Sequence, residues 1–438
     1  MKQVFLCILM LCGLAQSAFA AVEIQEVESK SGIKAWLVEE HQIPFVALEI
    51  AFKGGTSLDL AGKRGATGFM MALLEEGAGD LDAQGFANAR DDVSAQFVFD
   101  AGADFATISV QMLTDERAKS VALLKTALMS PRFDEAAIDR VRGQIQSIIV
   151  SNAKDPSTIA RHKFAKAAFG DHPYGSSDMG TAASIDAITH ADLHAAHLAT
   201  LTRDRMFVSA VGDITKEELS ILLDNLLGDL PAKGAPLPHR ADYGLMAGTD
   251  VTAFPTPQSV VQFGHLGLKR DDPDFFAAYL VNEVFGGGGF DSRLMNEVRE
   301  KRGLTYGISS YLIPRTHSEM IVGSFSSSND RVKEAIEVVK GEWAKIAENG
   351  ITAEELSTTK TYLTGAYPLR FDGNARIADI LVGMQAQGLS PNYVRTRNAK
   401  IEAITLEDAN RVARRIYDSK ALHFTVVGMP DGLTKPES

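Results

Sequence analysis

The chain has 438 residues, of which 45% are hydrophobic and 23% charged, and its formal net charge is -12. This length and hydrophobic content indicate a soluble globular protein with two domains or more. The negative charge, which no basic stripe offsets, argues against a nucleic-acid partner.

The first twenty residues have the pattern of a secretory signal peptide. Lys2 supplies a positive start, Val4 to Leu14 an apolar run, and Ala18 to Ala20 a small-x-small cleavage site. We therefore expect a secreted protein, periplasmic in location, that begins at residue 21. No later apolar stretch approaches transmembrane length, so no membrane insertion is expected after cleavage. Both cysteines, Cys7 and Cys12, lie in this segment, and the mature chain is expected to owe nothing to disulfides.

After residue 20 the chain shows one order of elements twice. Each half begins with an apolar strand and an apolar helix, continues with two alternating strands, and then has helical segments and a closing strand. These segments begin near Ile43, Gly65, Val93, Thr114, Phe133 and Met206 in the first half, and near Gln258, Phe275, Tyr306, Asn329, Ile351 and Leu422 in the second. We predict an α+β fold made of a duplicated unit of roughly 200 residues. Thr114 and Asn329 are expected to cap the helices that follow them.

The helix predicted after Gly65 reads GATGFMMALLEEG. Its methionines and leucines favour packing in a core rather than a role as ligands. Glu75 and Glu76 precede Gly77, a natural residue to follow a helix end. We interpret both as solvated carboxylates at that end.

Three histidines, His190, His194 and His197, share one face of a later predicted helix and offer an accidental metal site. No carboxylate lies in a catalytic position between them, so the favoured interpretation is an ordinary amphipathic helix. His172, in the sequence HPYG, is likewise expected to be structural.

A Pro- and Gly-rich stretch from Gly228 to Gly248 divides the mature chain near its middle and predicts a linker. We place a first domain at residues 21–230, the linker at 231–250 and a second domain at 251–434.

The segment from Phe285 to Tyr306, FGGGGFDSRLMNEVREKRGLTY, carries the strongest functional signal. Four glycines lead into a helix that bears Arg299, Gly303 ends that helix, and Tyr306 opens a strand. An Arg and a Tyr on the two sides of a helix end can both offer hydrogen-bond donors to one peptide carbonyl. The alternative is that Arg299 is a cation favoured by the helix dipole and Tyr306 a strand-start aromatic.

The four glycines, Gly286, Gly287, Gly288 and Gly289, have two interpretations of equal weight. They let the backbone approach another chain closely, or they form a tight turn. No GK[ST] sequence follows them, so a phosphate-binding loop is not indicated.

The Phe285 to Tyr306 segment resembles the signature of the C-terminal domain of the M16 peptidases, the family of insulinase, pitrilysin and the mitochondrial processing peptidase. HPYGSSDMGT, from His172 to Thr181, resembles a loop of the family's N-terminal domain, and the resemblance extends over the mature chain. It implies two homologous M16-type (LuxS/metallohydrolase-like) α/β-sandwich domains that form half of a clam-shell around an unfolded peptide. It also implies that Arg299 and Tyr306 hold the scissile carbonyl and its oxyanion, with Gly286 to Gly289 near the substrate.

One part of the family pattern is missing. Active members carry HxxEH on a helix of the first domain, where two His hold zinc and the Glu activates water, and a further Glu lies downstream. In this chain the two His positions fall on Gly68 and Ala72, and the Glu position falls on Met71. Val141 to Lys154 contains no carboxylate where the third ligand is expected. We therefore expect this chain to bind no metal or other cofactor.

These observations predict a non-catalytic subunit that belongs to a peptidase only as part of a complex. A related subunit would hold the zinc, and this chain would contribute Arg299 and Tyr306 from across the chamber. The alternative is a peptide-binding or scaffold protein without a role in turnover, for which the polar segment Ser324 to Asp330 offers the border of a groove. An autonomous zinc enzyme based on the three histidines is the least favoured alternative.

Overall fold

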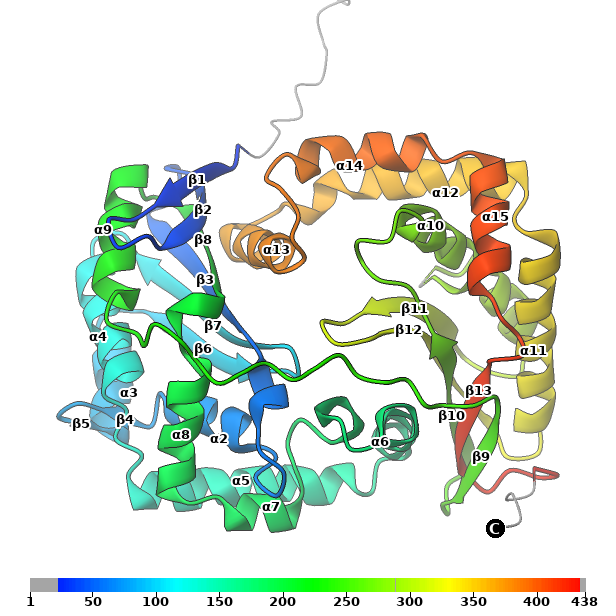
Figure 1. Cartoon of the computed structure of the whole chain (residues 1–438), viewed down its shortest axis with the longest axis horizontal. Coiled ribbons are helices and arrows are strands. Elements are labelled where there is room, and N and C mark those ends of the chain that lie inside the picture. The colour runs from blue at the N-terminus through cyan, green and yellow to red at the C-terminus, as the bar shows by residue number, and fades with distance from the viewer. Residues whose placement is uncertain (1–22, 288, 434–438) are drawn as a thin grey trace, which may run out of the picture.

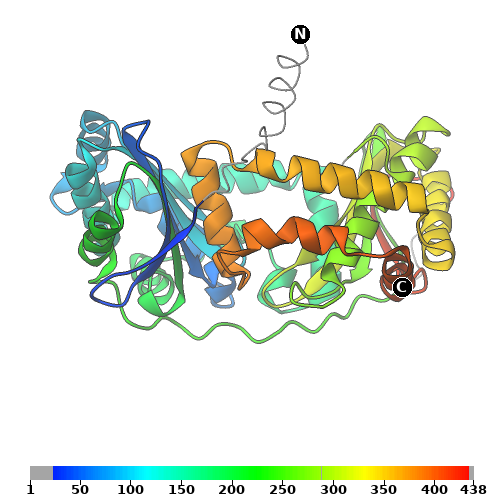
Figure 2. The same cartoon turned by 90° about the horizontal axis from the view of Figure 1, so that it is seen from above.

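The computed structural model describes residues 23–287 and 289–433, so the predicted signal peptide and Gly288 lie outside the described residues. Two large β-sheets lie at opposite ends of the molecule, and helices cover the outer side of each (Figure 1). Seen from above, long helices run between the two ends, and the segment that connects the two units runs along one side of the molecule (Figure 2). The fold is therefore mixed α and β with two sheet-based units, as predicted.

The first sheet has the strand order β1-β2-β8-β3-β7-β6. Its strands are β1 (Gln25–Glu28), β2 (Lys34–Glu39), β3 (Phe45–Lys53), β6 (Gln96–Ala101), β7 (Phe105–Leu113) and β8 (Met206–Gly212). Strands β2 and β8 run parallel, and the remaining pairs are antiparallel. A short hairpin of β4 (Gly77–Ala78) and β5 (Leu81–Asp82) lies outside this sheet.

The second sheet has the order β11-β12-β10-β13-β9. Its strands are β9 (Gly248–Ala253), β10 (Gln258–Leu266), β11 (Ile308–Pro314), β12 (Glu319–Ser328) and β13 (His423–Gly428). Only β9 and β13 run parallel among these described strands. Read from the opposite edge, this pattern of order and direction repeats that of β2-β8-β3-β7-β6, which is the signature of a duplicated unit.

The helices follow the same repeat. The first unit has α2 (Ala66–Leu73), α3 (Ala83–Asp92), α4 (Arg117–Met129), α5 (Glu135–Asn152), α6 (Pro156–Phe169), α7 (Ala182–Ala187), α8 (His190–Thr200) and α9 (Lys216–Leu227). The second has α10 (Phe275–Gly286), α11 (Val332–Asn349), α12 (Ala353–Ala366), α13 (Asn374–Ala386), α14 (Tyr393–Glu402) and α15 (Leu406–Ile416). Within the described part of the chain, no helix is both long and apolar enough to cross a membrane.

Helices α6 and α13 occupy equivalent positions in the two units, and each packs on the sheet of the other unit. Helix α6 contacts β10 and β13, while α13 contacts β3 and β8. The apolar contact on the first sheet consists of Trp36, Ala47, Val211, Ala378, Leu381 and Met384. The Ser209 hydroxyl on β8 also donates a hydrogen bond to the carbonyl of Ala378 at 2.6 Å. The inner face of each sheet is thus covered by a helix that the other unit supplies.

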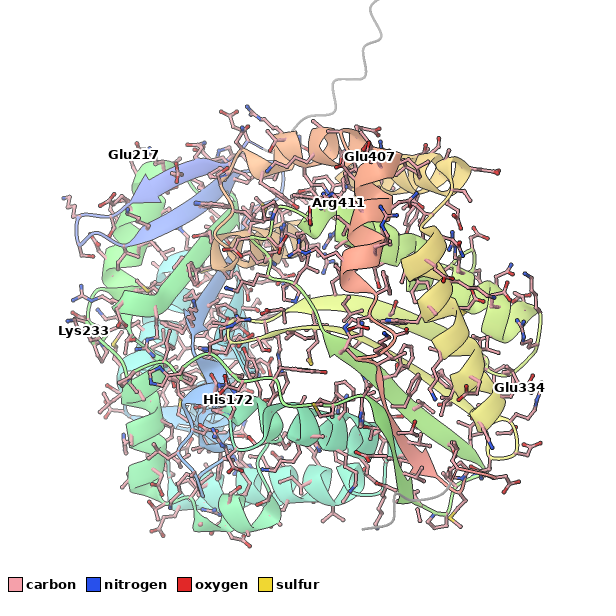
Figure 3. All side chains as sticks on the ribbon, turned by 45° about the vertical axis from the view of Figure 1, so that its right-hand side comes forward. His172, Glu217, Lys233, Glu334, Glu407 and Arg411 are labelled. Carbon is pink, nitrogen blue, oxygen red and sulfur yellow. The ribbon has the colours of Figure 1, made fainter. Side chains whose placement is uncertain are left out.

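The turn between β11 and β12 docks onto the first unit through Tyr174. This side chain is 2% exposed, and its hydroxyl donates to Asp104 and accepts from the His317 N–H at 3.0 Å. His172 accepts from the Tyr174 N–H at Nδ1, and its Nε2 donates to the carbonyl of His239 in the segment that joins the units (Figure 3). The HPYG loop therefore ties both units to the connecting segment, and His172 is structural as predicted.

The predicted caps at Thr114 and Asn329 are wrong. Helices α4 and α11 begin three residues later than each of these positions, and neither has a side-chain cap. The Thr114 hydroxyl instead donates to Asp213 at 2.8 Å, and the Asn329 side chain donates to the carbonyl of Thr256 at 2.8 Å. Both side chains join segments that are distant in sequence, and such tertiary bonds override the local preference.

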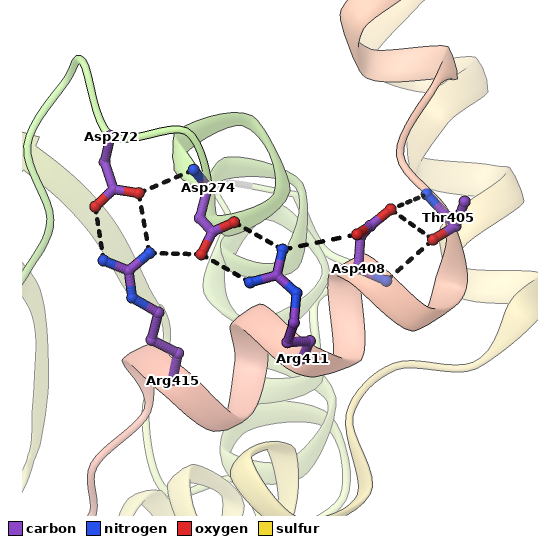
Figure 4. A network of polar contacts seen from close by, with 6 residues as sticks. All are labelled: Asp272, Asp274, Thr405, Asp408, Arg411 and Arg415. Carbon is purple, nitrogen blue, oxygen red and sulfur yellow. Dashed lines mark hydrogen bonds and ion pairs between the residues drawn. The ribbon is translucent and has the colours of Figure 1, made fainter.

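A network of opposite charges holds α15 to the loop before α10 (Figure 4). Arg411 donates to both carboxylate oxygens of Asp274 at 2.7 and 2.9 Å, and Arg415 does the same for Asp272. The hydrogen bond from Arg411 is the main cause that lowers the pKa of Asp274 to about 2. Bidentate arginine pairs of this kind fix geometry as well as charge, so α15 and the start of α10 form one fixed corner.

Glu49 on β3 lies beneath α13 and is 7% exposed. Burial raises its pKa from 4.5 to about 7, and the charge of Asp379 on α13 adds to this effect. Because the folded state holds the proton more tightly than the unfolded state, this group costs no stability below pH 4.5 and destabilises the fold increasingly as the pH rises to 7. At about 1.4 kcal/mol per pKa unit, the loss is at most roughly 3 kcal/mol.

Glu49→Gln is expected to reduce this pH dependence, because an amide carries no titratable proton. Urea unfolding midpoints of both proteins at pH 5 and pH 8 test it. The variant is expected to lose less stability than the wild type between the two values, and an equal loss in both proteins would show that Glu49 is not the titrating group.

Candidate functional site

Helix α2, where the family pattern would place a metal, is part of the first hydrophobic core. Met71 is 0% exposed, and the methionine and leucines beside it are fully buried as predicted. Gly68 and Ala72 are half-buried and offer no ligand atoms. No group of three or more His, Cys, Asp or Glu in the described residues could hold a metal ion.

Helix α5, which packs on α2, places the cation of Arg142 beside it. Arg142 on α5 lies over the ring of Phe69 at 5.3 Å and donates hydrogen bonds to the carbonyls of Ile185 and Ile188. A guanidinium so close to α2 would repel a divalent cation. The residues present therefore do not fit a zinc site.

The interpretation of Glu75 and Glu76 as solvated carboxylates is wrong. Both are partly buried, and they pair with Arg90 on α3 and Arg140 on α5. Burial raises the pKa of Glu75. The reason is that the end of α2 is enclosed by neighbouring helices, a property of the tertiary structure that its local sequence does not show.

The three histidines of α8 gather around the ring of Phe133. Ring centroids of His194, His190 and His197 lie 4.9, 6.3 and 6.4 Å from it. His197 is buried and donates from Nε2 to the carbonyl of Leu128 at 2.7 Å. Aromatic packing and this hydrogen bond account for the histidines, as the favoured interpretation predicted.

The glycines after α10 differ in their surroundings. A Cβ at Gly286 would lie 2.2 Å from the Ser310 hydroxyl, and one at Gly287 would lie 2.6 Å from the carboxyl group of Glu283. Gly286 therefore allows α10 to pack closely against β11, and Gly287 allows the segment after α10 to pack closely against Glu283 of that helix. Gly289 is exposed, with open space around it. The substrate contact expected of this loop remains a prediction.

Arg299 lies in a π-helical turn, Met295–Glu300, and Gly303, three residues after this turn, has φ +59°. Its guanidinium stacks over the exposed ring of Phe290 at 4.7 Å and lies 3.4 Å from the Glu300 carboxylate. Among the described residues, Nη1 has no hydrogen-bond partner. Single π-turns are rare and concentrate at functional sites.

Tyr306 lies two residues before β11, and its side chain is 86% exposed. It borders a cavity of about 670 Å³ on the inner face of the second sheet. The polar residues of this cavity, here called the polar cavity, are Ser157, Arg161, Gln258, Gln262, Thr305, Tyr306, Ser309, Tyr311, Ser324 and Ser326. Arg299 is not among the residues that line it. The structure thus places Tyr306 at a cavity and Arg299 on the adjoining turn.

Strand alternation explains the chemistry of the polar cavity. On β10, Val261 and Phe263 point into the second core, whereas Gln258 and Gln262 face the cavity. On β12, Phe325 belongs to the core and the serines on either side face the cavity. A strand with this period has one apolar and one polar face. At this cavity the inner face of the second sheet therefore presents hydroxyl and amide groups, together with Val260 of β10.

Known proteins match the chain over most of its length. The family described as "Peptidase M16 inactive domain" matches residues 187–363. The non-peptidase homolog YmxG of Helicobacter pylori (strain ATCC 700392 / 26695) is 24% identical over 415 residues, 95% of each protein. The crystal structure of a peptidase M16 inactive domain from Pseudomonas fluorescens has a TM-score of 0.88 and 27% identity, covering 95% of this chain and 100% of that one.

The chain is thus similar to members of the peptidase M16 family, and its residues 187–363 match that family's inactive domain. An uncharacterized zinc protease of Mycobacterium tuberculosis (strain ATCC 25618 / H37Rv) is also similar, with 26% identity over 81% of this chain and 82% of that protein. In the present chain Gly68, Met71 and Ala72 stand where the residues of HxxEH are expected.

Several residues of the polar cavity were missed in the sequence, and Ser157 and Arg161 are the most distant of them from the predicted segments. Ser157 and Arg161 come from α6, at the start of a helix that crosses from the first unit to the second sheet. Their local sequence is that of an ordinary helix start, so only the exchange of α6 and α13 reveals their position. The segment Ser324 to Asp330, predicted as a groove border, does contribute Ser324 and Ser326.

Proposed function

We propose that this chain is the non-catalytic subunit of a heteromeric M16 zinc peptidase. A related subunit with an HxxEH helix would hold the metal, and this chain would supply Arg299 and Tyr306 to the carbonyl group of the bound peptide. The complex would act after export, in the periplasm. The partner's zinc would supply the activated water, and this chain would supply hydrogen-bond donors.

The exposure of Tyr306 carries this proposal. A tyrosine that stabilised the fold would bury its ring, yet this one is 86% exposed beside a polar cavity. In the same chain Met71 is fully buried where a catalytic glutamate would stand. A chain that offers hydrogen-bond donors for a peptide carbonyl but has no zinc ligands would supply one half of a peptidase site.

The position of Arg299 is consistent with this role. If the guanidinium turned toward a peptide carbonyl, it would lose a stacking contact with Phe290 and a loose ion pair with Glu300. It would lose no hydrogen bond from Nη1, because Nη1 makes none with the described residues. As the carbonyl oxygen gains negative charge in the tetrahedral intermediate, bonds from an arginine and a phenol strengthen. These two donors would therefore favour the transition state over the bound substrate.

Purification of the tagged mature protein from its native cells, followed by mass spectrometry, tests the partnership. We expect a stoichiometric partner with an HxxEH sequence, and peptidase activity only in fractions that contain both chains. A point mutant of the partner's glutamate in that motif serves as the inactive control. Recovery of the protein without any such partner would contradict the proposal.

The second candidate function, peptide binding without turnover, is favoured by the polar cavity itself. Its hydroxyl and amide groups can bind a peptide backbone whether or not a metal subunit is present. This function predicts peptide affinity in the single chain and no effect of Arg299 on any hydrolysis.

A further inference from the structure

A second cavity, of about 420 Å³, lies between α10, α13, α14 and the edge strand β11. It contains no residue of the predicted Arg299–Tyr306 site. Its lining is dominated by aromatic rings and arginines, including Tyr279, Tyr311, Tyr367, Arg270, Arg370 and Arg397. We call it the aromatic–arginine cavity.

The arginines of this cavity have only neutral hydrogen-bond partners among the described residues. Arg397 is 5% exposed, donates to the Leu363 carbonyl at 2.7 Å and to the Asn398 side chain at 3.0 Å, and lies over the ring of Tyr367 at 4.4 Å. Arg270 donates to the side chains of Gln387 and Tyr393 at 2.9 and 3.2 Å.

Arg370 is exposed at the rim, in the short turn after α12, and no carboxylate in the described residues lies within 4.0 Å of it. Several arginines elsewhere in the molecule pair with carboxylates instead. Arg411 and Arg415 bind aspartates in bidentate fashion (Figure 4), and Arg293 binds both oxygens of Glu355 at 2.7 Å. The guanidinium groups of the cavity therefore lack an acidic partner among the described residues, and the carboxylate of a ligand could pair with them.

Two carboxylates, those of Glu283 and Asp379, also line the cavity and limit what the ligand can be. Asp379 lies 3.7 Å from Arg376 on the same helix. Glu283 on α10 is half-buried, has no hydrogen bond or ion pair with the described residues, and burial alone raises its pKa. Burial is the main cause that raises the pKa of Tyr279, and the charge of Glu283 raises it further. The charges of Arg397 and Arg370 lower the pKa of the same hydroxyl. Tyr279 thus lies between an acidic and a basic part of the wall. A phosphate dianion would be repelled by Glu283, while a ligand with one carboxylate and a nearby N–H donor matches both parts.

We propose that the aromatic–arginine cavity binds the C-terminal end of a peptide whose last residue is aromatic or large and apolar. The terminal carboxylate faces Arg370 and Arg397, the last side chain packs among the tyrosine rings, and a peptide N–H faces Glu283. That the ligand is a peptide rests on the proposed function. The cavity's own chemistry selects the free carboxylate and the apolar side chain.

The two cavities of the second unit share a wall. Tyr311 lines both, and it lies five residues after Tyr306 on the same extended segment. An extended chain spans about 17 Å in five residues. A peptide with its end in the aromatic–arginine cavity can thus run back along β11 to the polar cavity and Tyr306.

Binding of short peptides to the full mature chain, without any partner, tests this inference. The probes are Ala-Ala-Phe and Ala-Ala-Ala-Ala-Ala-Phe with a free C-terminus, their C-terminal amides, and the same peptides ending in glycine. We expect each free acid ending in Phe to bind roughly tenfold or more tightly than its amide, because a charged hydrogen bond is lost. Equal affinity of acid and amide, or no binding of either, would overturn the proposal.

Variants locate the site. Arg370→Ala is expected to remove most of the preference for the free acid, and Arg370→Lys to keep part of it. Arg395→Ala is the matched control, since Arg395 is exposed on α14 and is not among the residues that line the cavity. Acid preference that survives Arg370→Ala unchanged would place the binding elsewhere and overturn the assignment. Because no partner is present, this outcome is independent of whether a zinc subunit exists.

Discussion

Arg299→Ala, in the complex with the zinc subunit, is expected to lower kcat/KM by about 10²–10³-fold, because the loss of one oxyanion donor costs on the order of 2.7–4 kcal/mol. Tyr306→Phe removes only a hydroxyl and is expected to have an effect of the same order. If the donors act mainly on the transition state, kcat falls together with kcat/KM while KM changes little. Steady-state hydrolysis of a fluorogenic peptide by the reconstituted complex measures both constants.

Lys301→Ala is the control for this experiment. Lys301 lies two residues after Arg299, is exposed and pairs with Glu297 at 2.5 Å, so its loss removes a surface charge and no predicted substrate contact. Its kcat/KM is expected to match the wild type. If Arg299→Ala retained full activity in an intact complex, this chain would not complete the peptidase site.

Trp343→Ala is expected to destabilise the protein by about 3–5 kcal/mol, the usual cost of removing a large buried aromatic side chain. Trp343 is 0% exposed, and its ring packs against Phe285 at 5.1 Å and Tyr417 at 4.9 Å. Its Nε1 donates to Nε2 of the buried His265 at 3.1 Å, which would lose its partner. The midpoint of urea unfolding, followed by circular dichroism, measures the change.

Tyr362→Ala provides the comparison, because Tyr362 is 60% exposed on α12 and surface changes usually stay within about 0.5 kcal/mol. Trp343→Phe is expected to lose an amount of stability between the losses of Trp343→Ala and Tyr362→Ala, since it keeps an aromatic ring and loses the hydrogen bond. A midpoint for Trp343→Ala equal to that of the wild type would show that the second core does not depend on this residue.

Most of the elements could be predicted because their apolar periodicity is local. The alternation on β10 and β12 separates a core face from a polar face, and the buried methionines of α2 distinguish packing from ligation. The failed predictions concern side chains with distant partners. Thr114, Asn329 and Glu75 each bond to residues far away in the sequence, and their own neighbours in the chain do not indicate this.

The candidate site follows the same division. Arg299 and Tyr306 are close in sequence, so a motif could indicate them both. Ser157 and Arg161 reach the polar cavity only because α6 lies on the sheet of the other unit. The aromatic–arginine cavity likewise draws Arg270, Arg370 and Arg397 from three separate stretches of chain, and no single segment carries its pattern.

The exchange of α6 and α13 also determines how the molecule can move. A hinge in the connecting segment, residues 228–247, would have to withdraw α13 from its contacts with Trp36 and Val211 and α6 from β10 and β13. Withdrawal of α13 would expose the apolar residues around Trp36 and Val211, and withdrawal of α6 would expose Phe164 together with Met320 and Val322 of β12. The cost rises with the apolar area uncovered. We therefore expect the two units to move as one rigid body, and in the proposed complex a peptide would enter only through a displacement of this whole chain relative to its partner.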